Sequence, residues 1–248
     1  MFDNVFLILV GSLVGFLGTF FGIGGGIILV PILILVYNLP PNSAIATSLA
    51  VILFSSLAGI LIQYKQKKIN YIAGLILSAG AIPGAYFGSY FVNNIQSDNL
   101  KYYLFSIFLV IGIFMANGNI VNKLNNLNRK NYSISFLTSI TIGLISTIAG
   151  IGGGLFQVPQ MVYFLNFEIK NAIATSQLII LITSLTATIT NLFYGKILYY
   201  FIFPIFIGSI FGSFYGNKIN SKFDSIQLKK IFSILIFISA IVILVKSY

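Results

Sequence analysis

The chain has 248 residues, of which 58% are hydrophobic and 7% are charged. A soluble domain has about 25% charged residues, so this composition excludes a protein whose surface lies mainly in water. The sequence has no Cys and no His, and its four acidic residues are Asp3, Asp98, Glu168 and Asp224. It lacks the Cys and His ligands of zinc clusters, thiolate nucleophiles and histidine bases, so we expect neither an enzyme nor a cofactor or metal site.

The net charge of +10 comes from Lys and Arg residues that lie almost entirely in the short gaps between apolar runs. This placement is typical of residues that orient helices in a membrane, and it does not indicate nucleic-acid binding. The first apolar run has no basic leading region and no cleavage site, so we expect it to be a retained helix rather than a signal peptide.

Two pentapeptides occur twice in the chain. Gly22-Ile-Gly-Gly-Gly26 returns as Gly150-Ile-Gly-Gly-Gly154, at an offset of 150 − 22 = 128. Ala44-Ile-Ala-Thr-Ser48 returns as Ala172-Ile-Ala-Thr-Ser176, at an offset of 172 − 44 = 128. Composition bias in a membrane protein does not produce two identical pentapeptides at one shift, so we infer an internal duplication.

The duplication extends over most of the chain. Without a gap, residues 15–101 align with 143–229 and share 29 identities in 87 positions. The sequence therefore predicts a first membrane repeat at 1–117, a cytoplasmic linker at 118–131 and a second membrane repeat at 132–248.

Each half contains five apolar segments that predict helices. In the first half they span 4–21, 27–37, 43–63, 70–92 and 101–117, and in the second half 133–149, 155–165, 171–193, 197–216 and 228–246. The second segment of each half is too short for a hydrocarbon core that needs about 20 residues. The first two segments form either one broken span, which gives parallel repeats, or a hairpin, which gives inverted repeats. As a single helix, residues 4–37 would be about 50 Å long, too long for one crossing.

The distribution of basic residues favours the hairpin. In the inverted arrangement the side of the linker holds eleven of them: Lys65, Lys67, Lys68, Lys123, Arg129, Lys130, Lys170, Lys218, Lys222, Lys229 and Lys230. The opposite side holds three, namely Lys101, Lys196 and Lys246, whereas parallel repeats would give eight against six. The positive-inside rule thus predicts an all-α polytopic protein with two inverted repeats, a cytoplasmic linker and both termini outside. This plan recurs in secondary transporters.

Each glycine cluster lies between one apolar helix and a shorter one, so we expect a helix break in each half. The helix that restarts near Gly26 or Gly154 presents free N–H groups and a positive dipole end, which suit an anion. The alternative is that these glycines only permit close helix packing. The candidate backbone donors are Gly24, Gly25, Gly26, Gly152, Gly153 and Gly154.

Small hydroxyls follow each break at equivalent positions. Thr47, Ser48, Thr175 and Ser176 can donate hydrogen bonds to an oxyanion, or they can cap and join helices instead. The spacing Gly80-x-x-x-Gly84-x-x-x-Gly88 returns at Gly208, Gly212 and Gly216, and it predicts close packing between helices rather than a ligand site.

Amides distinguish the second half from the first. Gln157, Gln160 and Gln177 stand where the first half has Leu29, Ile32 and Leu49. Buried amides in a membrane are costly without partners, and an asymmetric substrate needs unequal halves. We therefore add Gln157 and Gln177 to the candidate substrate-binding residues; the alternative is that some of these amides face the membrane interface and have no role in binding.

The twin glycine-rich breaks, each followed by Pro31 or Pro159 and then by Ala-Ile-Ala-Thr-Ser, resemble those of the TauE/SafE family of bacterial membrane transporters, the sulfite exporter family. The resemblance covers essentially the whole chain. It implies a multi-pass plasma-membrane protein that exports small anions such as sulfite or organosulfonates. From the inverted repeats we expect alternating access, in which one half rocks against the other. Its partners would be the anion and the lipid bilayer, with a homo-oligomer left open. A small-anion channel and a non-transporting membrane scaffold are the alternatives.

Overall fold

The computed structural model describes residues 2–64, 67–96, 99–100, 102–107, 109 and 131–220. In these ranges the chain is all-helical and contains no strand, as the composition predicts. The predicted linker at 118–131, apart from its last residue, lies outside the described residues. So do the predicted apolar segment at 228–246 and most of the one at 101–117.

Four helices are described in each half, and all eight correspond to predicted apolar segments. Those of the first half are α1 (Phe2–Phe21), α2 (Gly26–Leu35), α3 (Pro41–Tyr64) and α4 (Tyr71–Asn94). Those of the second half are α7 (Tyr132–Ile148), α8 (Gly154–Phe164), α9 (Ile169–Phe193) and α10 (Tyr199–Asn220).

Five of the described helices are long and apolar enough to cross a membrane: α1, α3, α4, α9 and α10. By contrast, α2 has 10 residues and α8 has 11. At 1.5 Å per residue they measure about 15 Å and 17 Å, roughly half of the hydrocarbon core. The prediction that the second segment of each half does not span the membrane by itself is therefore confirmed.

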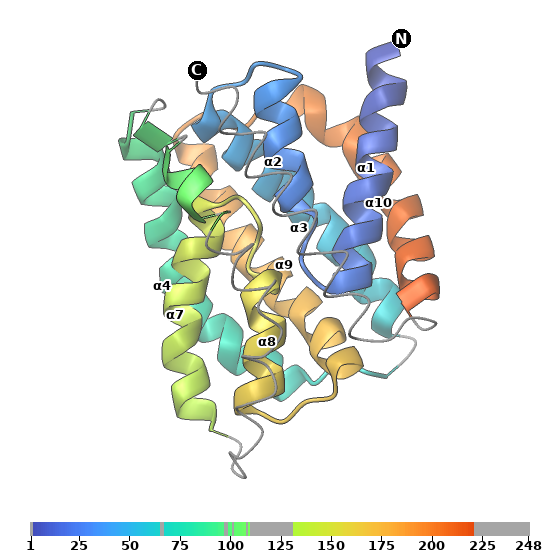
Figure 1. Ribbon diagram of the computed structural model, residues 1–248, viewed down its shortest axis with the longest axis vertical. Coiled ribbons are helices and arrows are strands. Elements are labelled where there is room, and N and C mark those ends of the chain that lie inside the picture. The colour runs from blue at the N-terminus through green and yellow to red at the C-terminus, as the bar shows by residue number, and fades with distance from the viewer. Residues whose placement is uncertain are drawn as a thin grey trace.

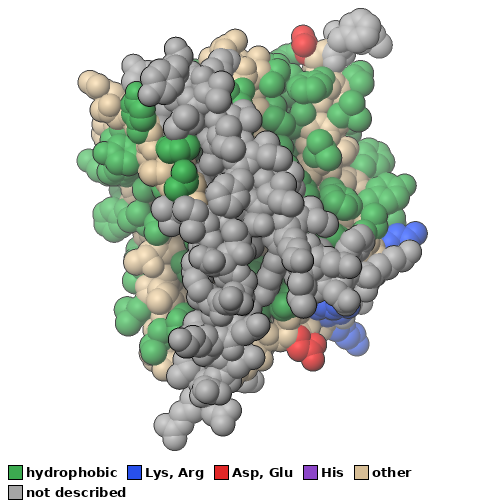
Figure 2. Space-filling model, viewed as in Figure 1, with side chains coloured by type: hydrophobic (Ala, Val, Ile, Leu, Met, Phe, Trp, Pro, Cys, Tyr) green, Lys and Arg blue, Asp and Glu red, His purple; other side chains and the backbone are tan. Residues whose placement is uncertain are grey.

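Many large apolar side chains are exposed, and Figure 2 shows them in green on both flanks of the face in view. Phe193 is 87% exposed, Ile72 71% and Phe203 70%. Soluble monomers rarely expose contiguous apolar surface on this scale, because water penalises it, whereas lipid does not. Together with the spanning helices, this surface makes the chain a multi-pass membrane protein.

Two pairs of helices join the halves side by side, α1 with α10 and α4 with α7 (Figure 1). Gly11 lies against the backbone of Ile205 and Gly15 against that of Ser209, so α1 and α10 run in the same direction. A Cβ at either glycine would collide with the facing carbonyl oxygen.

The glycines that recur every four residues in the sequence lie in these same helix contacts. Gly80 and Gly84 of α4 face Phe136 and Ile140 of α7, and the glycines of α10 face α1 in the equivalent way. The expectation that these glycines bring two backbones together is therefore confirmed.

At the centre, α3 of the first half packs against α9 of the second. Ile52 and Ile180 both approach Gly24, with side-chain carbons 3.1 Å and 3.4 Å from the position of a Cβ on that glycine. Further along α3, Gly59 meets Gln177, which precedes Ile180 on α9. The residue numbers in contact therefore rise along α3 while they fall along α9, so the two helices are antiparallel.

Candidate functional site at the paired helix breaks

Both predicted helix breaks are present, and they have the same backbone course. In the first half α1 ends at Phe21 and α2 begins at Gly26, with φ of 73° at Gly22, 87° at Gly24 and 76° at Gly25. In the second half α7 ends at Ile148 and α8 begins at Gly154. The corresponding φ angles are 69° at Gly150, 79° at Gly152 and 102° at Gly153. Residues with a Cβ rarely adopt such positive φ angles, which is why these positions carry glycine.

The helices that restart after the breaks have no side-chain cap. Gly25 and Gly153 occupy the N-cap positions and make no side-chain hydrogen bond to the first turn. The first N–H groups of a helix have no partner within the helix, and the helix dipole adds positive potential there. Gly26 and Gly154 are buried, so both positive helix ends lie inside the protein.

The two breaks contact each other across the halves. The Ser48 hydroxyl donates to the Gly150 carbonyl oxygen at 2.9 Å, and the Ser176 hydroxyl donates to the Gly22 carbonyl oxygen, also at 2.9 Å. Gly26 lies against Gly150, and Gly154 lies against Gly22, at a distance that leaves no room for a Cβ. The structure thus brings the predicted glycines and serines of both halves into one interior region.

The hydroxyls of Thr47 and Thr175 receive hydrogen bonds from the other half. The backbone N–H of Leu198, just before α10, donates to Thr47 at 3.1 Å. The backbone N–H of Asn70, just before α4, donates to Thr175 at 3.0 Å. Both threonines are fully buried, and in this conformation they hold the start of the partner half's fourth helix.

Apolar side chains close the space between the breaks. Ile52 and Ile180 lie against both Gly24 and Gly152, and both are fully buried. An anion at the two helix ends therefore requires these side chains to move.

The predicted amides differ in their contacts. The Gln177 amide donates to the Gly18 carbonyl oxygen at 2.8 Å. Gln157 lies on α8, beside Ser139 of α7, and its amide nitrogen is buried without a hydrogen-bond partner. Of the two amide nitrogens, that of Gln157 has no partner, whereas that of Gln177 is engaged.

Sequence reasoning did not single out Ser135 and Ser139, which face the glutamines of α8 from α7. A signal was available. Extending the repeat alignment upstream pairs Ser135 with Leu7 and Ser139 with Gly11, so the second half gains polar groups on both helices at once.

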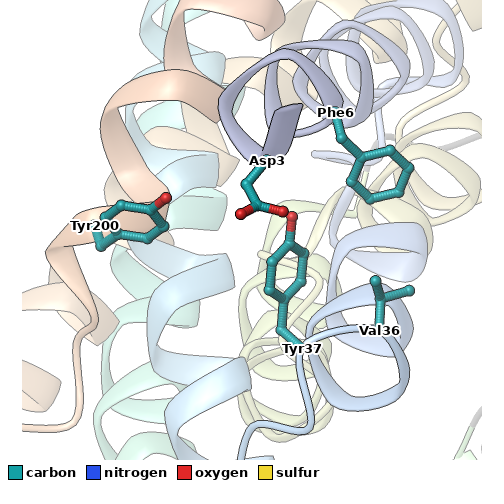
Figure 3. A pocket seen from close by; sticks show the side chains of 5 residues that line it. All are labelled: Asp3, Phe6, Val36, Tyr37 and Tyr200. Atoms are coloured by element: carbon teal, nitrogen blue, oxygen red, sulfur yellow. The ribbon is translucent and has the colours of Figure 1, made fainter. Parts of the chain in front are cut away.

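An open cavity of about 580 Å³ lies away from the breaks, where α1 and α10 begin and α2 ends. Asp3, Phe6, Val36, Tyr37 and Tyr200 line it, and in Figure 3 the Asp3 carboxylate and the Tyr37 hydroxyl point toward one another. The pKa of Tyr37 is raised above its ordinary value of 10.0, mainly by burial and to a smaller extent by the charge of Asp3 and by the Tyr200 hydroxyl. A carboxylate makes this cavity unfavourable for an anion, so the paired breaks remain the candidate site.

The chain matches the family model described as "Sulfite exporter TauE/SafE" over residues 7–243. It is 30% identical over 246 residues to the probable membrane transporter protein YunE of Bacillus subtilis, with 89% of this chain and 90% of the relative covered. It is 31% identical over 240 residues to the probable membrane transporter protein MJ0441 of Methanocaldococcus jannaschii, with 90% and 88% covered. No solved structure is significantly similar to the chain. The chain therefore belongs to the sulfite exporter TauE/SafE family and is a membrane transporter.

Proposed function

We propose that the protein is a secondary transporter that exports small anions across the plasma membrane by alternating access. The substrates we propose are sulfur oxyanions such as sulfite and small organosulfonates. The observation that carries this proposal is the meeting of two uncapped, buried helix N-termini, at Gly26 and Gly154, inside a membrane protein. Such helix ends bind oxyanions through backbone N–H groups and the helix dipole, without a fixed positive charge.

The helix directions support inverted repeats. The third helices of the two halves, α3 and α9, are equivalent by the repeat and run antiparallel. The fourth helix of each half runs parallel to the first helix of the other half. Discontinuous helices that meet between inverted repeats are a recurrent substrate site in secondary transporters, where one half moves against the other.

The packing at the centre supports a carrier rather than an open channel. Ile52 and Ile180 fill the space between the breaks, and Ser48 and Ser176 join the breaks across the halves. In this conformation both serine hydroxyls donate to glycine carbonyl oxygens. They can donate to an anion only after these hydrogen bonds break. A change of conformation at the site is the defining feature of alternating access.

Sulfur oxyanions are proposed from the family's description, and their oxygens suit a site built from neutral donors. With the cell interior negative, outward movement of one negative charge releases about 2.3 kcal/mol per 100 mV. Export of an anion therefore needs no proton relay.

The test is uptake of labelled sulfite by proteoliposomes that contain the purified protein, with an inside-positive potential imposed. Saturable, potential-driven uptake that shows counterflow supports the carrier. Uptake without saturation or counterflow favours the channel instead. If neither sulfite nor a small organosulfonate enters above the level of empty liposomes, the proposal is wrong and the scaffold alternative gains.

A further inference from the structure

A cluster of polar side chains lies between α7 and α8, and all but one of its side-chain polar atoms have hydrogen-bond partners. The Gln160 amide nitrogen has three acceptors within hydrogen-bond distance for its two hydrogens: the carbonyl oxygen of Ser135, Thr138 Oγ1 at 2.7 Å and Ser139 Oγ at 3.1 Å. Ser139 in turn donates to the Ser135 carbonyl oxygen at 2.8 Å, and it lies 3.5 Å from the Gln157 amide oxygen. These contacts use the Ser139 hydroxyl and both hydrogens of Gln160.

The atom left over is the amide nitrogen of Gln157. The residue is fully buried, and among the residues that the structure describes this is the one buried side-chain nitrogen without a hydrogen-bond partner. An amide N–H₂ can only donate. An unpaired buried donor is unfavourable, and more so in a membrane, where water is scarce. The group therefore requires an acceptor.

The first half of the protein shows that the helix break does not need this cluster. At the positions equivalent to the cluster, α1 and α2 carry only Leu7, Val10, Gly11, Leu29 and Ile32. Leu29, which corresponds to Gln157, is just as buried, and the glycine break before it has the same backbone course. A purely structural role for Gln157 would leave this difference between the halves unexplained.

Gln157 is also placed beside the positive end of α8. Its backbone N–H donates to the carbonyl oxygen of Gly153, the N-cap residue, at 3.2 Å. Gln157 lies three residues after Gly154, within the first turn of α8, and side chains of a helix lean toward its N-terminus. The neighbourhood is polar, since a Cβ on Gly153 would lie 3.5 Å from Ser146 Oγ and 3.6 Å from Thr183 Oγ1.

From these observations we infer that Gln157 is a specificity-determining residue of the transporter: its amide N–H₂ donates to an oxygen of the bound oxyanion, in a subsite that only the second half possesses. This inference rests on the proposed function. It also assigns the two helix ends unequal roles, because the first half offers backbone donors alone. The anion would therefore bind in one preferred orientation.

The experiment compares the kinetics of labelled sulfite uptake for the wild type, Gln157→Leu and Gln157→Met in proteoliposomes. Leu is the residue that the first half carries, and Met is close to Gln in length but has no donor. Loss of a hydrogen bond to a charged ligand should raise KM about tenfold to a hundredfold. Because the bond binds the anion and takes no part in the movement of the two halves, we expect the maximal rate to change by less than about threefold. Ser56→Ala is the control, because its hydroxyl bonds within its own helix, to Leu53 at 2.9 Å.

Thermal unfolding followed by circular dichroism separates a binding role from a structural one. Removing an unpaired donor should leave the midpoint of both variants at or above that of the wild type, since no hydrogen bond is lost. A lowered midpoint in both variants, with uptake falling in parallel, would overturn the inference. So would saturable wild-type uptake with KM unchanged in both variants, and in that case the proposed function would stand. Absence of uptake by the wild type would instead refute the proposed function, and the inference with it.

Discussion

The hydroxyl of Ser48 donates to the carbonyl oxygen of Gly150 at 2.9 Å, across 102 positions in the sequence. This bond joins the third helix of the first half to the helix break of the second half. The reciprocal bond, from Ser176 to Gly22, joins the third helix of the second half to the first break. Each break is thus hydrogen-bonded to the third helix of the opposite half, so a rearrangement at one serine changes the contacts of both halves.

Ser48→Ala should lower the stability of the protein by about 1 kcal/mol, because it removes an interhelical hydrogen bond and leaves a buried carbonyl oxygen without its donor. Ser176→Ala should cost less, since Ser176 also contacts the Ile173 carbonyl oxygen at 2.8 Å and so shares its hydrogen between two acceptors. The measurement is the thermal midpoint in detergent, with Ser56→Ala as the control. Equal midpoints for Ser48→Ala and the control would contradict the structural importance of the bond.

Gly15→Ala should destabilise the α1–α10 contact by about 1–3 kcal/mol, because a Cβ there collides with the backbone of Ser209. Gly18→Ala, in the same helix, is the matched control. Its Cβ would lie 3.4 Å from the nearest atom, which is ordinary contact, and alanine favours a helix more than glycine does. Thermal unfolding of the two variants tests this. Similar midpoints would mean that α1 and α10 do not pack as closely as described.

Replacing both Ile52 and Ile180 by Ala should open the closed centre. These side chains fill the space beside Gly24 and Gly152, and each truncation removes several buried carbons. We expect a non-saturable leak of chloride from liposomes, measured with an anion electrode. Leu33→Ala, which truncates a fully buried core residue that is not at the breaks, should leave liposomes tight. A tight double variant would show that Ile52 and Ile180 do not close the pathway.

Asp3→Asn should lower the pKa of Tyr37 but keep it above 10.0. Burial is the larger cause of the raised value and remains in the variant, whereas the negative charge that disfavours the phenolate is removed. The pKa falls because the phenolate is negatively charged and is repelled less once the carboxylate is gone. The measurement is the titration of ¹³C-labelled tyrosine by NMR, with the Tyr37 signal assigned from Tyr37→Phe. An unchanged Tyr37 pKa would mean that the carboxylate does not act on the hydroxyl.

The duplication, the helical segments and the two breaks could be predicted from the sequence, because local properties determine them. Apolar runs form helices in a membrane wherever they occur, since every backbone group must be paired there. Consecutive glycines permit positive φ angles at any position in a fold, and those at 22, 24 and 25 adopt them. The repeat comparison also indicated that the second half differs from the first at Gln157 and Gln177.

Only the tertiary structure decided what each polar side chain contacts. Gln157 and Gln177 are the same residue type at equal burial, yet the amide of Gln177 reaches the Gly18 carbonyl oxygen and that of Gln157 reaches no acceptor. The serines and threonines at the start of α3 and α9 were equally consistent with ligand binding and with helix joining. Their partners lie in the opposite repeat, more than a hundred positions away in the sequence. Spacing along a chain determines which face of a helix a residue occupies, but the partner across that face depends on how whole helices pack.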